Sequence, residues 1–416
     1  MKTLLYFEEY ESNLSHKLQE RKDINLIILR STKNMKFFRE EYLKETEKFP
    51  CYVTDYYGDM DEEVKKFQEW LRQNHLEIDY FFNDSEYYLE YSNQFASKLG
   101  LEALTEEQTA WVRDKVKMKE RFREIGLDTV DFTPIDSKEE LIEFFQKNGG
   151  KRIVFKPRRG MNSIDTYKID SLEDIENLDI KWEPGKYMAE DFCSDHEWAI
   201  ESLVQDGVVL DSYLTYIPNP TIWASIANDL NCHMTVPEVP EFFQFVPKEF
   251  IQTIVTGMNL KDGAMTIEVF ISKDGQVKAS ELGWRLPGCQ STLNHSYSYG
   301  IDIYNLLIDI ALHNKVTLSY PDKIISVGDL YLPNKEGIIT ELTPLEELLQ
   351  MDGVIGGEMF AQLGKYQKKR RVGNDASGWV QVQGETPEET LAKMTDVFSK
   401  FKIEAVGKER EYVKES

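Results

Sequence analysis

Two glutamates, Glu268 and Glu281, lie on either side of a strong turn signal and offer the clearest chemistry in the sequence. The Asp274-Gly275 dipeptide is typical of a two-residue type I′ hairpin turn, and apolar residues alternate on both sides of it. Such a turn pairs Glu268 with Glu281 on one face of the hairpin, with Cβ atoms about 4.5–5.5 Å apart. Two carboxylates at that separation repel each other unless water, protonation or a cation relieves the repulsion. A divalent ion that binds both carboxylates and phosphate oxygens is one interpretation, and a solvated sheet edge with two independent glutamates is the other.

A fixed positive charge follows the second glutamate. Arg285 comes four residues after Glu281, and Pro287-Gly288 then turns the chain away. A guanidinium can bind a phosphate or a carboxylate through two parallel hydrogen bonds. A metal site beside such a cation suits phosphoryl transfer, in which positioning and charge neutralisation provide most of the catalysis. The pattern therefore favours an enzyme that handles nucleotide phosphates.

Two lysines, Lys115 and Lys156, are further candidates for binding phosphate. Lys115 lies in a predicted helix, and Lys156 ends the run RIVFK before a polar turn that contains Gly160 and Ser163. Backbone amides in such a turn can fold over phosphate oxygens. The sequence has no GxxxxGK[ST], no HRD with DFG, no HExxH, and no GxGxxG among its first strands. Phosphate-loop, kinase, zinc-peptidase and dinucleotide sites are therefore disfavoured.

The helices and strands that must position these residues follow from the hydrophobic pattern. Near the N-terminus the pattern alternates strands with a helix capped by Asp59, a βαβ rhythm. Farther along it turns to capped helices and antiparallel hairpins. Strands are predicted at residues 24–29, 51–57, 80–82, 152–156, 164–169, 187–192, 198–205, 208–216, 326–331, 337–340 and 379–384. Helices are predicted at residues 61–76, 105–125, 302–314 and 387–401, with another that starts at Ser137, and an irregular segment suited to a lid is predicted at 217–240.

The chain is long enough for several packed units, which together give a multidomain fold of the α/β and α+β classes. Four units are expected. They are an α/β domain at 1–103, a helix-and-sheet unit at 104–189, a larger unit with the glutamate hairpin at 190–320, and a separate α+β cap at 321–416.

Charge and composition narrow the class of partner. The 416 residues include 49 Lys and Arg against 73 Asp and Glu, a net charge of −24 that repels nucleic acid and anionic lipid. The apolar run at the N-terminus is too short for a signal peptide, and no run approaches the length of a membrane helix, so we expect a cytoplasmic protein. Four scattered cysteines without CxxC spacing predict free thiols, neither a disulfide framework nor a zinc site.

In their order along residues 105–315, these motifs resemble the ATP-grasp superfamily. The matching segments are Asp114-Lys115, Lys156-Pro157 with the glycine turn, AEDFCSDHEW, and the two glutamates followed by Arg285. The resemblance implies an ATP-grasp fold with a Rossmann-like domain before it. The layout of the chain further resembles the L-amino-acid ligase branch.

The resemblance also implies roles for individual residues. Lys115, Lys156 and the turn with Gly160 and Ser163 would bind ATP phosphates. The segment AEDFCSDHEW would bind adenine and ribose through Glu190, Phe192 and Glu197. Glu268 and Glu281 would be magnesium ligands, and Arg285 would steady an acyl phosphate. One departure concerns the metal: Gly283 stands where the family commonly has asparagine, so this position offers no side-chain ligand for a second ion.

We therefore expect an ADP-forming carboxylate-amine ligase that uses ATP with Mg²⁺ or Mn²⁺ and takes small-molecule acid and amine substrates. Ser291 and His295 are candidates for the substrate pocket, with Tyr297, Trp223 and His233 as weaker ones, although a structural role is the alternative for each. Two other hypotheses stay open. The amine acceptor could be an acidic carrier protein that docks on the basic run at 365–371, or the chain could be a nucleotide-binding regulator without turnover. Self-association as a homodimer is compatible with the sequence.

Overall fold

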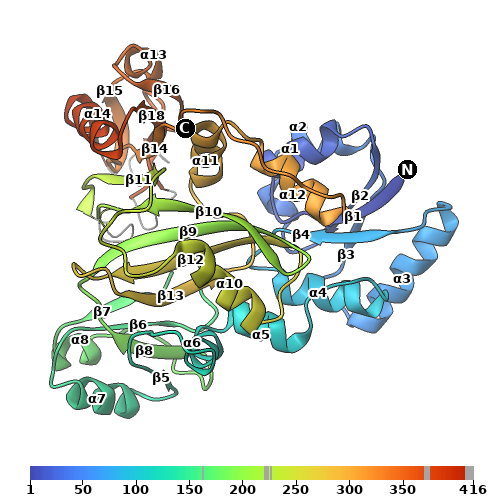
Figure 1. Cartoon of the computed structure of the whole chain (residues 1–416), viewed down its shortest axis with the longest axis horizontal. Coiled ribbons are helices and arrows are strands. Elements are labelled where there is room, and N and C mark those ends of the chain that lie inside the picture. Colours follow the sequence, from blue (N-terminus) through green and yellow to red (C-terminus); the bar gives the residue numbers. More distant parts are fainter. Residues whose placement is uncertain (162–163, 220–223, 225–226, 370–374, 408–416) are drawn as a thin grey trace.

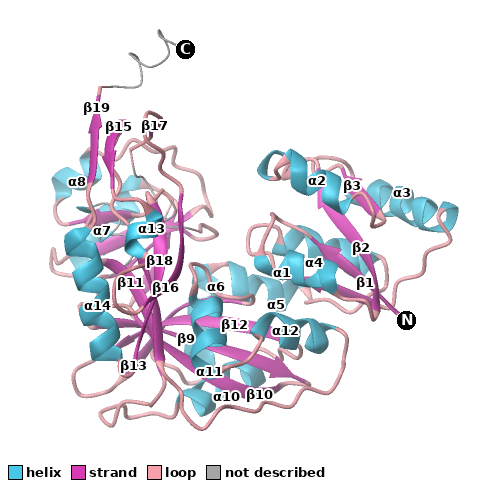
Figure 2. Cartoon of the chain, turned by 90° about the horizontal axis from the view of Figure 1, so that it is seen from above, coloured by secondary structure: helices cyan, strands magenta, loops and turns pink. Residues whose placement is uncertain are grey.

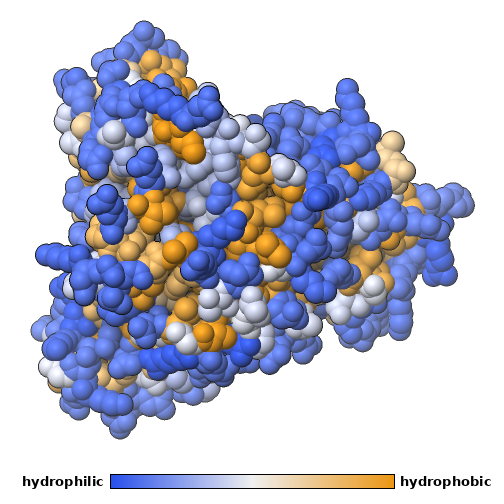
Figure 3. All heavy atoms as spheres, in the orientation of Figure 1, coloured by the Kyte–Doolittle hydropathy of each residue, from blue (hydrophilic) through white to orange (hydrophobic). Residues whose placement is uncertain are grey.

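Four β-sheets with flanking helices make up the computed structural model of the chain (Figure 1). The structure describes residues 1–161, 164–219, 224, 227–369 and 375–407. Within these residues no helix is long and apolar enough to cross a membrane. All four cysteines are free, as predicted. Hydrophilic side chains cover most of the face shown in Figure 3, with apolar groups between them.

The N-terminal unit is a parallel sheet in the order β3-β2-β1-β4. The βαβ rhythm is confirmed, and Asp59 caps its helix by accepting a hydrogen bond from the Glu62 amide. Strand β1 was not predicted, because a parallel strand buried on both faces is a short continuous apolar run without alternation. The elements are β1 (Lys2–Phe7), α1 (Asn13–Glu20), β2 (Ile24–Ser31), the 3₁₀ turn η1 (Met35–Phe37), α2 (Glu40–Thr46), β3 (Cys51–Thr54), α3 (Met60–Gln73), β4 (Tyr80–Asn83) and α4 (Leu89–Lys98).

The single helix predicted over 105–125 is instead two helices, α5 (Glu106–Arg113) and α6 (Lys115–Glu124). Asp114 breaks it, with an extended backbone and a carboxylate that accepts hydrogen bonds from the amides of Val116 and Lys117. The same carboxylate binds the Arg158 guanidinium at 2.8 and 3.0 Å. A capping residue inside a helical pattern can start a new helix instead of continuing the old one. Hydrophobic periodicity alone does not reveal such a break.

A small antiparallel sheet follows, in the order β5-β8-β6-β7. Strand β5 lies at an edge, where Pro134 costs no ladder hydrogen bond on its open side. The elements are β5 (Phe132–Ile135), α7 (Lys138–Lys147), β6 (Ile153–Pro157), β7 (Tyr167–Ile169), α8 (Leu172–Glu176) and β8 (Tyr187–Asp191).

The large sheet has eight strands in the order β13-β12-β9-β10-β11-β14-β18-β16. Two expectations are wrong here. The segment 217–240 was predicted to be irregular, but it contains β11, whose buried polar residues hide any alternation. Residues 321–416 were expected to form a separate cap, but three of their strands extend this sheet through β14, which pairs with β11. The elements are β9 (His196–Gln205), β10 (Val208–Tyr216), β11 (Asn231–Val236), α10 (Pro247–Gly257), β12 (Gly263–Ile271), β13 (Val277–Gly283), α11 (Ser291–Tyr299), α12 (Ile303–Ala311), β14 (Ser326–Tyr331), β16 (Val354–Met359) and β18 (Gly378–Gly384).

The remaining C-terminal strands form the fourth sheet, which has three strands in the order β17-β15-β19, and α14 packs against β14 and β18 (Figure 2). The helix predicted at 387–401 is confirmed, with Thr386 as its N-cap. These elements are β15 (Gly337–Leu342), α13 (Leu345–Leu348), β17 (Tyr366–Gln367), α14 (Pro387–Lys400) and β19 (Ile403–Val406).

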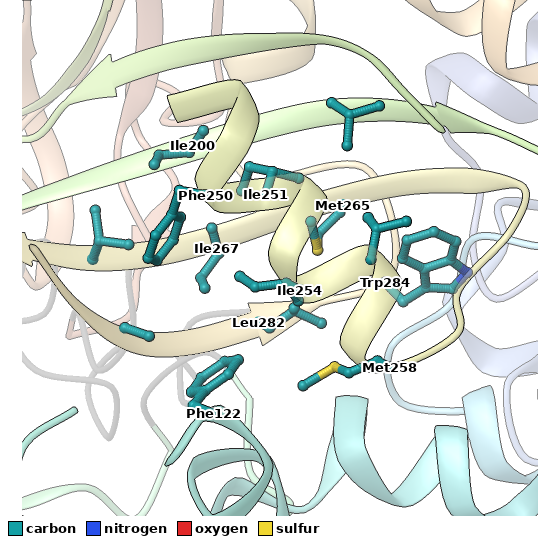
Figure 4. Close-up of a cluster of buried hydrophobic side chains, with 14 of the residues drawn as sticks. Phe122, Ile200, Phe250, Ile251, Ile254, Met258, Met265, Ile267, Leu282 and Trp284 are labelled. Carbon is teal, nitrogen blue, oxygen red and sulfur yellow. The ribbon is translucent and has the colours of Figure 1, made fainter. Parts of the chain in front are cut away.

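The largest apolar core lies under the glutamate hairpin. Helix α10 packs its apolar face on β9, β10 and β12, and Phe122 of α6 reaches the same cluster (Figure 4). Ile251, Ile254 and Ile267 are completely buried there. Each such side chain contributes about 1.5–3 kcal/mol through burial. This core holds β12 and β13 rigidly, which fixes the strands that carry Glu268 and Glu281.

The pairing of Glu268 with Glu281 is confirmed, but the loop and the strand register that produce it differ from the predicted ones. The connection is a three-residue loop between Ser272 and Gln276, with only Gly275 of the loop at positive φ, rather than a two-residue type I′ turn. That loop shifts the pairing by one residue near the turn, where Val269 faces Ala279. A β-bulge then restores the predicted register, so that Glu281 faces Glu268.

Gly275 offers a test of this turn. Its φ is +81°, and a Cβ there would lie 1.8 Å from the Phe242 carbonyl oxygen, so Gly275→Ala must displace backbone. Gly364 is the matched control, with a φ of +74° and open space around it. We expect Gly275→Ala to lower the free energy of unfolding by about 3 kcal/mol or more and Gly364→Ala by only about 1 kcal/mol. Urea unfolding followed by tryptophan fluorescence measures both, and equal losses would contradict the described packing.

Candidate active site

The side chain of Glu281 joins three elements at one point. Lys156 at the end of β6 donates to its Oε1 at 2.6 Å, and Lys115 at the start of α6 lies 3.1 Å from its Oε2. Lys156 also binds Glu190 of β8 at 2.5 Å. Both lysines are almost fully buried, whereas Glu281 remains partly open to solvent. The residues predicted from three separate motifs therefore meet in one cluster of charged side chains, called the cleft from here on.

The break at Asp114 explains how Lys115 reaches this cleft. The Lys115 amide donates to the Arg158 carbonyl at 2.9 Å, which ties the start of α6 to the chain just after β6. The Lys115 side chain in turn donates to the Gly160 carbonyl at 2.8 Å. Asp114, Lys115, Arg158 and Gly160 thus form one unit that orients the glycine turn toward Lys156. Ser163, the other residue expected in this turn, lies outside the described residues.

The three acidic groups of the cleft differ in their affinity for protons. Desolvation would raise the pKa of Glu281, but Lys115 and Lys156 outweigh it and hold the pKa well below its usual range. Desolvation and then Glu197 and Glu281 raise the pKa of Glu268 to about 8. Desolvation and Glu281 likewise raise the pKa of Glu197 to about 7. The Glu268 side chain is accessible to water. The groups crowded around it in the cleft desolvate its carboxylate, not burial in an apolar core. The cleft therefore has an excess of negative charge around Glu268, which a cation would relieve.

Lys119 is a functional candidate that was not predicted. It lies one helical turn after Lys115, is completely buried, and its Nζ is 3.2 Å from the second carboxylate oxygen of Glu190. It also donates to the Ser280 carbonyl at the bulge of β13. Burial lowers the pKa of Lys119, against the attraction of Glu190. The i, i+4 spacing from Lys115 was the available signal, since it places both ammonium groups on one face of α6.

Arg285 lies beside this cleft and is bound to an acid of the N-terminal unit. Its Nε donates to Oε2 of Glu86 at 2.6 Å, and its Nη2 contacts the same oxygen. Arg113 of α5 lies 3.2 Å from the other oxygen of Glu86. A role for Glu86 was not predicted, because no local sequence pattern indicates that it pairs with Arg285, almost two hundred residues away. Glu86 connects the N-terminal unit to Arg285, which follows the glutamate hairpin.

Gly283 is not required by crowding. A Cβ at this position would make ordinary contacts of 3.4 and 3.5 Å with the side chains of Thr266 and Arg285. Within the described part of the chain, no group of three or more His, Cys, Asp or Glu side chains is arranged to hold a metal. A divalent ion on Glu268 and Glu281 would therefore need further oxygen ligands from phosphate or water.

The other predicted residues lie at varied distances from this centre. Glu197 is half-buried on β9, close enough to Glu281 and Lys156 for their charges to shift its pKa. Phe192 follows β8, and its ring packs against the Arg152 guanidinium. Ser291 is buried at the start of α11.

His295 is completely buried, with Nε2 2.6 Å from Glu201 and 2.9 Å from the Thr215 hydroxyl. His233 is bound to Asp329 at 3.0 Å. These contacts give both histidines a structural place in the large sheet and its helices. Trp223 lies outside the described residues.

The chain is similar to a known protein family and to solved structures. Residues 330–406 match the family model of the L-amino acid ligase C-terminal domain 2. The crystal structure of an L-amino acid ligase from Bacillus licheniformis superposes with a TM-score of 0.73 at 17% identity, over 98% of this chain and 99% of that one. The chain has the ATP-grasp fold. The predicted resemblance to ATP-grasp ligases and to their L-amino-acid ligase branch is confirmed.

Two further relatives extend the comparison. An L-arginine-specific L-amino acid ligase from Bacillus subtilis is 22% identical over 268 residues, which make up 62% of this chain and 63% of that protein. The match thus spans less than two thirds of that relative's length. The biotin carboxylase domain dimer of a 2-oxoglutarate carboxylase from Hydrogenobacter thermophilus, in complex with ADP, MgADP and bicarbonate, has a TM-score of 0.64 at 14% identity, over 98% of this chain and 91% of that one. These names give no support to the carrier-protein hypothesis.

The charge excess at Glu268 predicts a pH-dependent stability. The pKa of Glu268 is about 8 in the folded chain against an ordinary 4.5, so between these values the folded state holds the extra proton and stability falls as pH rises. Glu268→Gln cannot ionise and escapes this loss. We expect its thermal unfolding midpoint, without metal or nucleotide, to exceed that of the unmodified chain at pH 8 and to approach it near pH 4.5.

Glu281→Gln serves as the control of opposite sign. The low pKa of Glu281 stabilises the fold above its ordinary pKa, and that stabilisation is lost as pH falls through the folded value. The substitution should therefore lower the midpoint at neutral pH, where it removes the carboxylate charge beside two buried lysines and leaves Lys156 only Glu190 as a partner. A pH-independent difference in both variants would refute the described electrostatics.

Proposed function

We propose that the protein is an ADP-forming ligase that joins a carboxylate to an amine through an acyl phosphate. The observation that carries the proposal is the Glu268–Glu281 pair, which faces two buried lysines in a single cleft. The L-amino acid ligase relatives support the same reaction class. In the regulator hypothesis nothing would require this charged set to be assembled with Arg285 beside it.

In this proposal ATP lies between the small sheet and the large sheet. Lys115, Lys156 and the turn with Gly160 and Ser163 bind its phosphates. Glu190, Phe192 and Glu197 line the adenine and ribose end, as the resemblance implies. The Hydrogenobacter domain is described as a complex with ADP and its magnesium salt, which supports a nucleotide ligand for this fold.

Glu268 and Glu281 fit a magnesium ion. Both are carboxylates, the donor type that hard divalent cations prefer, and desolvation together with the negative charges of Glu197 and Glu281 raises the pKa of Glu268. When bound, the ion would neutralise phosphate charge and orient the γ-phosphate. Mn²⁺ has similar ligand preferences and stays a prediction.

The reaction would proceed in two steps. The substrate carboxylate attacks the γ-phosphorus of ATP, the bond to the bridging oxygen breaks, and ADP leaves. Lys115, Lys156 and Arg285 would stabilise the charge that develops on the transferred group. A neutral amine then attacks the acyl carbonyl, inorganic phosphate leaves, and the nitrogen loses a proton to form an amide.

Amino acids are the substrate class that the relatives support best, since two of them are named as L-amino acid ligases. Which amino acids this chain takes is not fixed by that similarity. The unit boundaries at 103 and 189 and a homodimer stay predictions, whereas the boundary at 320 does not separate a cap from the large sheet.

Glu281→Gln tests the proposal. Loss of the carboxylate removes a metal ligand and the partner of two lysines, so amino-acid-dependent ADP formation should fall about 100-fold or more. Glu249→Gln, an exposed glutamate on α10 outside the cleft, is the matched control and should keep normal turnover. ADP release across a panel of single and paired amino acids, with a pyruvate kinase coupled assay, measures both variants. Near-normal turnover by Glu281→Gln would count decisively against the assignment.

A further inference from the structure

A second cavity lies behind Arg285, where the N-terminal sheet meets the large sheet. Its volume is about 610 Å³, within the range of small-molecule sites. It runs along β4, the edge strand of the N-terminal sheet, and is bounded by residues 102–105 and 259–264. In Figure 1 this is the region where β4 approaches the right-hand end of β12. Glu268, Glu281 and Lys156 do not line it, whereas Arg285 does, so the cavity adjoins the proposed catalytic cleft without including its carboxylates and lysines.

The wall beside the large sheet is apolar. The indole of Trp284, visible at the edge of the core in Figure 4, lies close to Gly263, where a Cβ would be only 2.8 Å from the ring. Leu89, Leu104 and Phe82 add further apolar surface. A ligand with an organic body would bury that body here.

The rim carries more acid than base. Four carboxylates line the cavity, from Asp79, Asp84, Glu102 and Asp262. Lys261 forms an ion pair with Glu102 at 3.4 Å. Arg285 donates a hydrogen bond to Glu86, which does not line the cavity. Burial raises the pKa of Asp84 to about 7, against the Leu286 amide and Arg285, and raises the pKa of Asp262, against the Asp206 amide and His313. Asp262 lies 4.0 Å from the His313 imidazole, and Arg285 acts on Asp84 at longer range, so neither carboxylate has a close hydrogen-bonded cation among the described residues.

Asn93 supplies an independent sign of a ligand. Its side chain is 5% exposed and lines the cavity, and its Nδ2 has no hydrogen-bond partner among the described residues. A buried amide donor without an acceptor costs about 1–3 kcal/mol, so such groups usually face a water or a ligand.

We propose that this cavity binds a small organic cation. Asp84 and Asp262 would hold its ammonium or guanidinium group, Trp284 and Leu104 would cover its apolar body, and Asn93 would donate to an acceptor on it. The inference does not rest on the proposed ligase activity, because it uses residues outside the catalytic cleft.

The test compares two nearly isosteric probes on the intact chain without nucleotide. Isothermal titration calorimetry and the fluorescence of Trp284 should detect 2-phenylethylammonium, whereas neutral 2-phenylethanol should bind at least about 10-fold more weakly because it cannot pair with the carboxylates. Asp262→Asn should weaken binding of the cation about 10-fold and leave binding of the alcohol unchanged. Ala103→Trp, which fills the cavity without changing charge, should abolish binding of both probes.

Glu249→Gln is again the matched control and should bind like the unmodified chain. Circular dichroism checks that each variant is folded. If Asp262→Asn does not fold, binding by Ala103→Trp alone tests whether the cavity is the binding site. Equal affinity for both probes, or unchanged binding by folded Ala103→Trp, would overturn the proposal. So would loss of binding in Glu268→Gln with retention in Asp262→Asn, since that result places the cation in the catalytic cleft.

Discussion

The ionised carboxylate of Glu281, held between Lys115 and Lys156, is the interaction on which the candidate site depends. It connects α6, β6 and β13, which belong to three different parts of the fold. A buried charge without its partner is strongly destabilising, so each of these groups requires the others in place. Glu190 and Lys119 extend the network deeper, where Lys119 also reaches the bulge of β13. The cleft is therefore organised by charge before any substrate enters it.

Two local irregularities give this network its geometry. Asp114 interrupts a helix and binds Arg158, which brings Lys115 to the chain after β6. The bulge in β13 restores the register that the three-residue loop had shifted. Caps and bulges cost regular hydrogen bonds, and here each one aims a charged side chain at the same point.

The N-terminal unit takes part through Glu86, which holds both Arg285 and Arg113. Movement between this unit and the large sheet would change the position of Arg285 relative to Glu281. The cavity behind Arg285 lies at the same junction, and Asp84 accepts a hydrogen bond from the amide of Leu286 at 2.7 Å. The junction thus brings Arg285 and the proposed cation site into one structural neighbourhood.

Much of the site could be predicted from the sequence, because short-range signals carry it. The alternation around Asp274-Gly275 predicted the facing glutamates, and the order of the motifs predicted the ATP-grasp fold. The presence of strand β11, the attachment of the C-terminal strands to the large sheet, and the break at Asp114 were not predicted. The pairs Glu86–Arg285 and Lys119–Glu190 and the cavity behind Arg285 also emerged only in three dimensions. The physical reason is the range of the forces: turns, caps and periodicity act within a few residues, whereas a buried ion pair or a cavity exists only when packing brings distant segments together.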